Sequence, residues 1–139
     1  MAATGLETVL LVGARLLFGG VIAFMGLNHF LRLEGMAGYA EHKGLPAPKL
    51  SVVASGAVLV LGGLGIITGL FPLVSALAVA LFLLVSAITM HDFWAVEAAQ
   101  RQDEMTAFLK NVVMAGGALA IAALATQGWA VGLGIGLGL

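Results

Sequence analysis

Three pairs of polar residues stand at the ends of long apolar stretches and have the side chains best suited to chemistry. The pairs are Asn28-His29, His91-Asp92 and Lys110-Asn111. If the stretches cross a membrane in alternating directions, all three pairs lie at the same face. A histidine beside an aspartate can exchange protons, and lysine with asparagine can hold an anionic or carbonyl oxygen. The cluster therefore predicts a ligand or partner site beside an apolar channel, suited to the headgroup of a quinone.

A simpler interpretation stays open, because helix ends at a membrane interface are polar in any case. Asp92 would then pair with Lys110 and tie two spans together. His29 and His91 come from different stretches at a similar depth, as bis-histidine haem ligation requires. Two histidines are weak evidence for haem, and Asp92 is the only obvious third ligand for a metal. We therefore expect no metal site and do not favour haem.

The first apolar stretch carries a charged residue, Arg15, about nine residues after its start. A charge inside a span is costly and marks an interior site by default. At helical spacing, Gly19, Ile22, Gly26 and His29 share its face, and the glycines leave space there. We predict that this face lies inside the bundle. The alternative is that Arg15 extends to the membrane interface, towards Glu7.

Small residues also mark packing faces elsewhere in the chain. The second stretch carries Gly62, Gly65 and Gly69, the last two in a G-x-x-x-G pattern. In the fourth stretch, Asn111 starts a stripe that continues with Ala115, Ala118, Ala122 and Ala125. Both patterns predict close helix packing.

The composition sets the class of protein. Of 139 residues, 61% are hydrophobic and 9% are charged, against about 25% charged in soluble domains. The net charge of −1 gives no support for nucleic-acid binding. The chain has no cysteine, so thiol nucleophiles, iron–sulfur clusters and covalent haem attachment are excluded.

The hydropathy pattern predicts one transmembrane domain over residues 1–139. Four stretches approach the roughly 20 residues that cross a bilayer, at about residues 6–30, 50–70, 73–90 and 107–127. Pro72 suits the first turn of a helix and predicts a tight hairpin between the second and third stretches. Residues 128–139 form an apolar glycine-rich tail, in which Gly128, Gly132 and Gly136 repeat at four.

The first connection contains a further helical pattern. Leu33, Met36, Ala37 and Ala40 fall on one face, which is typical of a short amphipathic helix at the membrane surface. The predicted fold class is therefore an all-α integral membrane protein. It is an up-down bundle of four transmembrane helices with a short interfacial helix in the first connection.

The basic residues predict an orientation. Arg15 alone lies away from the long connections, and the other five lie on their side: Arg32, Lys43, Lys49, Arg101 and Lys110. The positive-inside rule then places the long connections in the cytoplasm and both termini outside.

The chain resembles the DoxX family of small four-helix bacterial and archaeal membrane proteins, from about Val9 to Ala125. The motifs that carry the resemblance are Arg15 with Phe18-Gly19-Gly20, Gly26, Gly44-Leu45-Pro46, Gly56, Leu61-Gly62-Gly63-Leu64, His91-Asp92-Phe93-Trp94 and Phe108-Leu109-Lys110-Asn111. The family name comes from a membrane subunit associated with thiosulfate:quinone oxidoreduction. The resemblance implies a setting of quinone-linked redox chemistry in a prokaryotic cytoplasmic membrane.

Three hypotheses follow from the sequence. The first is an accessory redox subunit, more than an autonomous enzyme, whose polar cluster contacts a bound quinone or a catalytic partner. The second is a structural subunit of a larger membrane complex, joined to other subunits or to copies of itself through its small-residue faces. The third is a carrier of a small molecule or lipid through the bundle interior around Arg15.

Overall fold

The structure, a computed structural model, describes residues 5–129 and 132. These residues form five helices: α1 (Gly5–Leu31), α2 (Leu33–His42), α3 (Pro48–Thr68), α4 (Pro72–Met90) and α5 (Ala98–Ala125). All but α2 are long and apolar enough to cross a membrane. The predicted four-helix membrane class and the helix in the first connection are confirmed.

Local sequence explains where α3 and α4 begin and end. Pro48 and Pro72 occupy the first turns of these helices, where a missing N–H costs nothing. Gly69 ends α3 with a φ of 74°, a left-handed conformation that glycine adopts without a steric penalty. The connection between α3 and α4 is therefore only three residues long.

The fourth span differs from its expected start. We predicted it from about residue 107, but α5 begins at Ala98, nine residues earlier. Residues 98–106 carry polar side chains and had the pattern of a connection. These residues form the first turns of α5, continuous with its apolar part, and place Glu104 beside His91.

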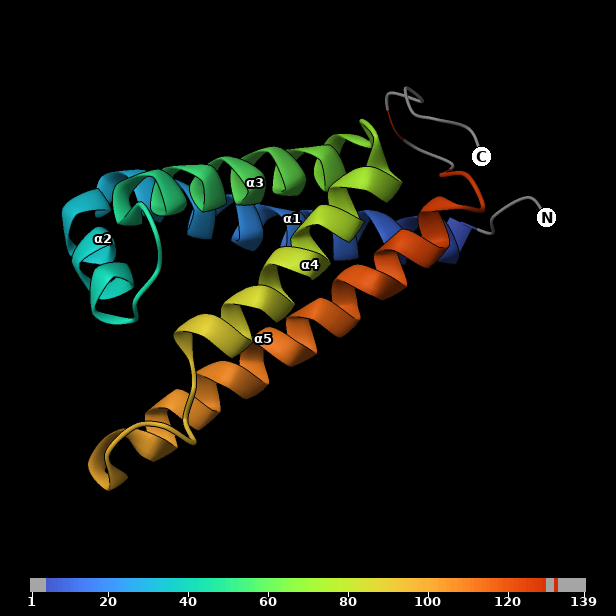
Figure 1. The fold of residues 1–139 in the computed structure, drawn as a ribbon. Coiled ribbons are helices and arrows are strands. Elements are labelled where there is room, and N and C mark those ends of the chain that lie inside the picture. The colour runs from blue at the N-terminus through green and yellow to red at the C-terminus, as the bar shows by residue number, and fades with distance from the viewer. Residues whose placement is uncertain (1–4, 130–131, 133–139) are drawn as a thin grey trace.

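The helices associate as two pairs, α1 with α3 and α4 with α5 (Figure 1). The two pairs meet through α3 and α4 near the short connection and diverge towards the other end (Figure 1). We call the end with the α3–α4 turn the closed end. The end with α2 and the α4–α5 connection is the open end.

Glycines allow the first pair to pack closely. A Cβ atom on Gly19 would lie 2.7 Å from the carbonyl oxygen of Gly63, and one on Gly26 would lie 2.7 Å from the Val60 nitrogen. In the α3–α4 hairpin, a Cβ on Gly62 would lie 2.5 Å from Val79 Cγ2. A Cβ atom on Gly65 would clash with Ser75 Oγ. Side chains at these positions would force the helices apart, so the small residues set the interhelical distance.

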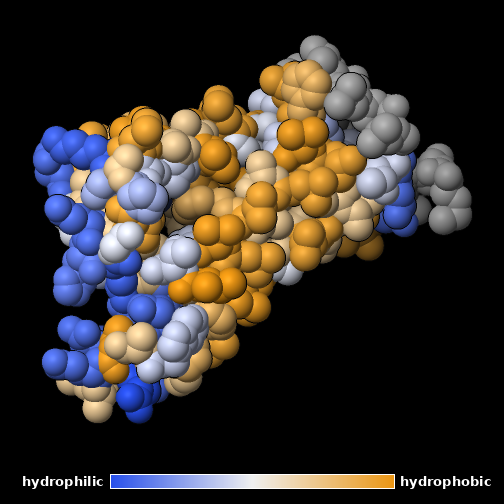
Figure 2. Space-filling model, viewed as in Figure 1, coloured by the Kyte–Doolittle hydropathy of each residue, from blue (hydrophilic) through white to orange (hydrophobic). Residues whose placement is uncertain are grey.

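The main hydrophobic core fills the bundle between the pairs. Ile22, Leu59, Ile66, Val79 and Leu83 are its largest fully buried side chains. From α5 the core receives Ala115, Ala118, Ile121 and Ala122, which include three members of the predicted small-residue stripe. The outer surface is an apolar band, and hydrophilic residues gather at the open end (Figure 2).

A second, smaller core holds α2 in place. Ala37 and Ala40 of α2 are buried with Val52 of α3. Leu33 and Met36 pack against the same cluster. The apolar face of α2 therefore covers the start of α3, in addition to any contact with lipid.

Candidate ligand-binding site

A cavity of about 750 Å³ lies at the open end of the bundle. All five helices contribute to its lining. Val52, Leu59, Phe82 and Leu83 are among its apolar residues. Its volume and its mainly apolar lining with a few polar groups are typical of small-molecule sites in proteins.

The cavity contains half of the polar residues that we singled out from the sequence. His29, His91 and Asn111 line it, whereas Asn28, Asp92 and Lys110 do not. In the two pairs that lie within helices, successive residues point about 100° apart, so one member faces inward and its neighbour does not; His91 and Asp92 follow the end of α4. Lys110, for example, is exposed while Asn111 is buried.

Asn111 is the most enclosed polar side chain of the cavity, with 7% of the residue exposed. Within residues 5–129 and 132, the structure gives its side chain no hydrogen-bond partner. An amide has two donor hydrogens and an acceptor oxygen. The amide atoms of Asn111 are not among the fully enclosed side-chain atoms that lack a partner, so they are accessible from the cavity that the residue lines.

His29 is oriented by its own helix. Its Nδ1 lies 2.8 Å from the Met25 carbonyl oxygen, which can only accept, so Nδ1 carries the proton. The ring also contacts the edge of Phe82, with 6.3 Å between the ring centroids. In the neutral imidazole, Nε2 is then the acceptor nitrogen.

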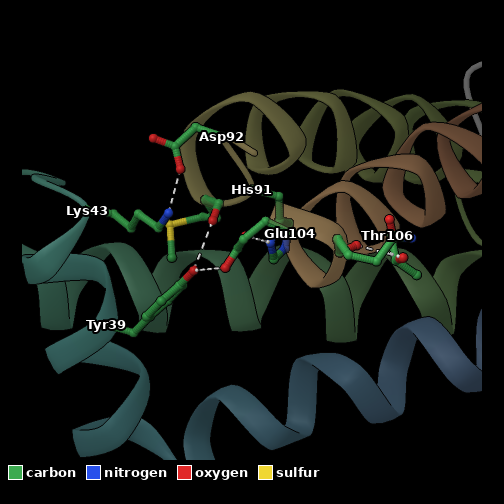
Figure 3. A network of polar contacts seen from close by, with 8 residues as sticks. Tyr39, Lys43, His91, Asp92, Glu104 and Thr106 are labelled. Carbon is green, nitrogen blue, oxygen red and sulfur yellow. Dashed lines mark hydrogen bonds and ion pairs between the residues drawn. The ribbon is translucent and has the colours of Figure 1, made fainter. Parts of the chain in front are cut away.

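His91 pairs with a carboxylate that we did not predict. Its Nδ1 lies 3.0 Å from Glu104 Oε2 (Figure 3). The other oxygen of Glu104 accepts a hydrogen bond from the Tyr39 hydroxyl at 2.8 Å, and that hydroxyl also lies 3.1 Å from the Met90 carbonyl oxygen. Tyr39 thus links α2 to both α4 and α5.

Asp92 pairs with Lys43, at the end of α2 (Figure 3). The predicted pair of Asp92 with Lys110 is wrong, because Lys110 points outward from α5 while the α2 segment lies next to the α4–α5 connection. We call Tyr39, Lys43, His91, Asp92 and Glu104 the clasp, since they join the two diverging helix pairs at the open end.

The clasp perturbs the ionisation of its members outside the spans. The hydrogen bond from Lys43 holds the pKa of Asp92 below its ordinary 3.8. Burial opposes the charge on Lys43, but the bond to Asp92 and the acidic groups nearby outweigh it and raise the pKa of Lys43 above 10.5. Burial, followed by the bond to Glu104, raises the pKa of Tyr39. Each shift favours the state in which the contacts stay formed near neutral pH.

The sequence held only a partial signal for the clasp. Glu104 stood in a segment that we took for a polar cap, and its spacing from His91 had no obvious meaning there. Tyr39 and Lys43 belong to the amphipathic segment, whose polar face we expected to meet water. Only the packing of α2 against α3 directs both side chains towards the α4–α5 connection.

Arg15 belongs to the closed end and does not line the cavity. It is 3% exposed, so its face of α1 lies inside the bundle as predicted. Its Nε and Nη2 donate to the Ile66 and Ile67 carbonyl oxygens at 2.9 and 2.7 Å. Its guanidinium also stacks over the Trp129 ring, 4.2 Å from the centroid. Arg15 therefore supplies donors to the last-turn carbonyls of α3, which have no helical partners.

Part of the predicted tail lies outside the described residues, including Gly136. Gly132 is described, and a Cβ atom built on it would lie 3.3 Å from the Thr68 carbonyl oxygen. Gly69 is close as well, since its own Cβ would lie 3.1 Å from Gly132 Cα. The chain after α5 thus approaches the end of α3 closely. Among the described residues, no group of three or more histidines and acidic residues could hold a metal ion.

The fold defines a multi-pass helical membrane protein with an internal cavity at its open end. The chain belongs to the DoxX family, whose family model, described as DoxX, matches residues 10–92. No curated protein and no solved structure matches it. The matched region covers most of α1 and all of α2 to α4, and it ends at Asp92. The α5 residues Glu104 and Asn111 lie beyond it.

Proposed function

We propose that this DoxX protein binds a quinone in the open-end cavity and serves as the quinone-binding subunit of a membrane redox system. The observation that carries the proposal is the amide of Asn111, which lines an otherwise largely apolar cavity and has no hydrogen-bond partner within the described residues. A quinone presents two carbonyl oxygens on a flat apolar ring. It needs hydrogen-bond donors surrounded by apolar walls, and this chemistry matches the lining.

The other cavity residues support the same ligand class. The aromatic ring of Phe82 offers an apolar face, and Ser86 places a hydroxyl in the lining. His91, oriented by Glu104, adds a second polar group. The mainly apolar lining suits the isoprenoid tail of a membrane quinone.

The setting follows from the family and the charge distribution. We place the protein in a prokaryotic cytoplasmic membrane, with the open end on the cytoplasmic side because five of the six lysine and arginine residues lie there. The chain has no cysteine, so thiol or iron–sulfur electron transfer would fall to another subunit. An accessory role beside a catalytic partner therefore fits better than an autonomous enzyme.

The first test is chemical identification of what copurifies. The protein is purified in mild detergent, extracted with organic solvent, and the extract is analysed by mass spectrometry for quinones and phospholipids. A stoichiometric quinone supports the proposal. A phospholipid bound in its place would instead favour a lipid-carrying role for the same cavity, and recovery of neither would contradict both.

The second test compares identical substitutions at neighbouring positions. Asn111→Leu removes the amide, whereas Lys110→Leu changes the exposed face of the same helix turn. Binding of a short-tailed quinone, measured by calorimetry in detergent, should weaken about tenfold in Asn111→Leu, because one hydrogen bond contributes about 1.4 kcal/mol. Lys110→Leu should bind like the parent. Equal affinity in both variants would overturn the assignment of Asn111.

A further inference from the structure

His91 connects the cavity to a carboxylate outside it. The residue lines the cavity, and its Nδ1 lies 3.0 Å from Glu104 Oε2. A carboxylate oxygen accepts, so Nδ1 carries a proton and Nε2 is the nitrogen left for another partner. In the described part of the chain, Nε2 has no hydrogen bond.

The Glu104 carboxylate is itself held in place. Its second oxygen accepts from the Tyr39 hydroxyl at 2.8 Å. A fixed carboxylate at Nδ1 orients an imidazole, sets its tautomer and stabilises the imidazolium that forms when Nε2 takes a proton. These are the properties of a general base directed at a ligand. Only 25% of the His91 side chain and 19% of the Glu104 side chain are exposed, so the pair has limited but real access to water.

We propose that His91 and Glu104 form an acid–base pair that takes a proton from the ring hydroxyl of a quinol bound in the cavity. The proposal rests on the quinone-binding function above. In the step, the O–H bond of the quinol breaks and an N–H bond forms at His91 Nε2. The quinol becomes a monoanion and His91 an imidazolium beside the Glu104 carboxylate. No electron moves in this step, and the same pair returns the proton in the reverse direction.

The ionisable groups around the pair come from several elements. The groups that face His91 from the surrounding elements are Glu104 of α5, Tyr39 and Lys43 of the α2 segment, Asp92 next in the chain, and His29 and Arg32 across the cavity. Lys43 is neutralised by Asp92, so Glu104 is the acidic group left to balance the imidazolium. The quinol anion would find Arg32 in the cavity lining.

The experiment uses two probes that differ in one ionisable group. The anion of 2-hydroxy-1,4-naphthoquinone represents the quinol anion, and 1,4-naphthoquinone is its uncharged counterpart. If the anion binds beside an imidazolium, His91 must take up one proton from solvent on binding, so the affinity should fall as the pH rises above neutral, by up to about tenfold per pH unit. The affinity of 1,4-naphthoquinone should not change with pH.

The variants separate the acid–base role from a structural one. In His91→Gln the affinity for the anion should be at least tenfold weaker at pH 7.5 and lose its pH dependence. Glu104→Gln should weaken it in the same direction. Lys43→Met with Asp92→Asn opens the other contact of the clasp and should keep the pH dependence. Thermal unfolding in detergent reports whether each variant is folded.

The outcomes distinguish the acid–base pair from quinone binding itself. A pH-independent affinity of the anion in the parent protein, or an unchanged pH profile in His91→Gln, would overturn the acid–base pair while quinone binding stands. Failure of the parent protein to bind either probe would overturn the proposed function itself.

Discussion

The two ends of the bundle use polar side chains in opposite ways. At the closed end, Arg15 donates to backbone carbonyls of α3 and stacks on Trp129. At the open end, Asn111 is almost as buried but has no partner in the described part of the chain. An intramembrane charge thus serves packing at one end, whereas a neutral amide at the other lines the open-end cavity. Burial of a polar residue in a membrane protein does not by itself identify a functional site; its partners do.

Helix packing differs in the same way. Glycines bring α1 and α3 into backbone contact, but the two helix pairs diverge at the open end, where the clasp joins them through side chains (Figures 1 and 3). The closed end is held by hydrogen bonds from Arg15 to backbone carbonyls. The open end is joined by contacts between ionisable side chains. Four predictions test this contrast by the loss of stability they should produce.

The largest effect is expected for Gly19→Val. Even a Cβ atom there would lie 2.7 Å from the Gly63 carbonyl oxygen, so α1 and α3 must separate. Overpacking of this kind should lower the free energy of unfolding by about 3 kcal/mol, measured by thermal unfolding in detergent. Gly20→Val is the matched control, because a Cβ at Gly20 meets nothing within 4 Å. Equal stability of the two variants would contradict backbone contact between α1 and α3.

Arg15→Met should have the next largest effect, a loss of about 2 kcal/mol. The α3 carbonyls of Ile66 and Ile67 would lose charged donors, and such bonds contribute about 1.5–3 kcal/mol each before the relief of a buried charge is subtracted. The affinity for a short-tailed quinone should stay unchanged, since Arg15 does not line the cavity. If Arg15→Met had normal stability but no longer bound quinone, Arg15 would belong to the ligand site and not to helix packing.

Lys43→Met should lower the melting temperature by less than Arg15→Met does, and the size of the fall should depend on pH. The depressed pKa of Asp92 means that its contribution is present above pH 3.8 and is lost as the pH falls through its folded value. The raised pKa of Lys43 means that its contribution is present below pH 10.5 and is lost above its folded value. The difference from the parent should therefore be constant between about pH 5 and pH 9.

The control for the Lys43 variant is Lys49→Met. Lys49 pairs with Glu34 at 2.6 Å, but both side chains are well exposed, and exposed pairs contribute little. A larger fall in melting temperature for Lys49→Met than for Lys43→Met would argue against the clasp as the contact that joins the two pairs.

Asn111→Leu should have the smallest effect on stability. The substitution breaks no hydrogen bond within the described residues, so the free energy of unfolding should change by less than about 0.5 kcal/mol. Thermal unfolding without added ligand measures this. A loss of more than about 1 kcal/mol would mean that Asn111 already holds the fold together.

The candidate site could be predicted only in part, and particular residues show why. His29, His91 and Asn111 were found because polar residues are rare in this chain and helix spacing gives their depth. We did not predict Glu104 as the partner of His91. We expected Lys110 of α5 to pair with Asp92, whereas its partner is Lys43, which follows α2. Sequence spacing along one helix gives no information about the rotation of the next helix, so it cannot choose between such partners.

The sequence alone determined that this is a four-span membrane protein and where α3 and α4 begin, and it favoured an inward-facing Arg15. These properties depend on hydropathy, proline geometry and the helical repeat, all of which are local. The tertiary structure decided which polar residues meet. The divergence of the two helix pairs opens the cavity, and the packing of α2 against α3 brings Lys43 to Asp92. Contacts between elements depend on their relative rotation and separation, and many packed residues set these together.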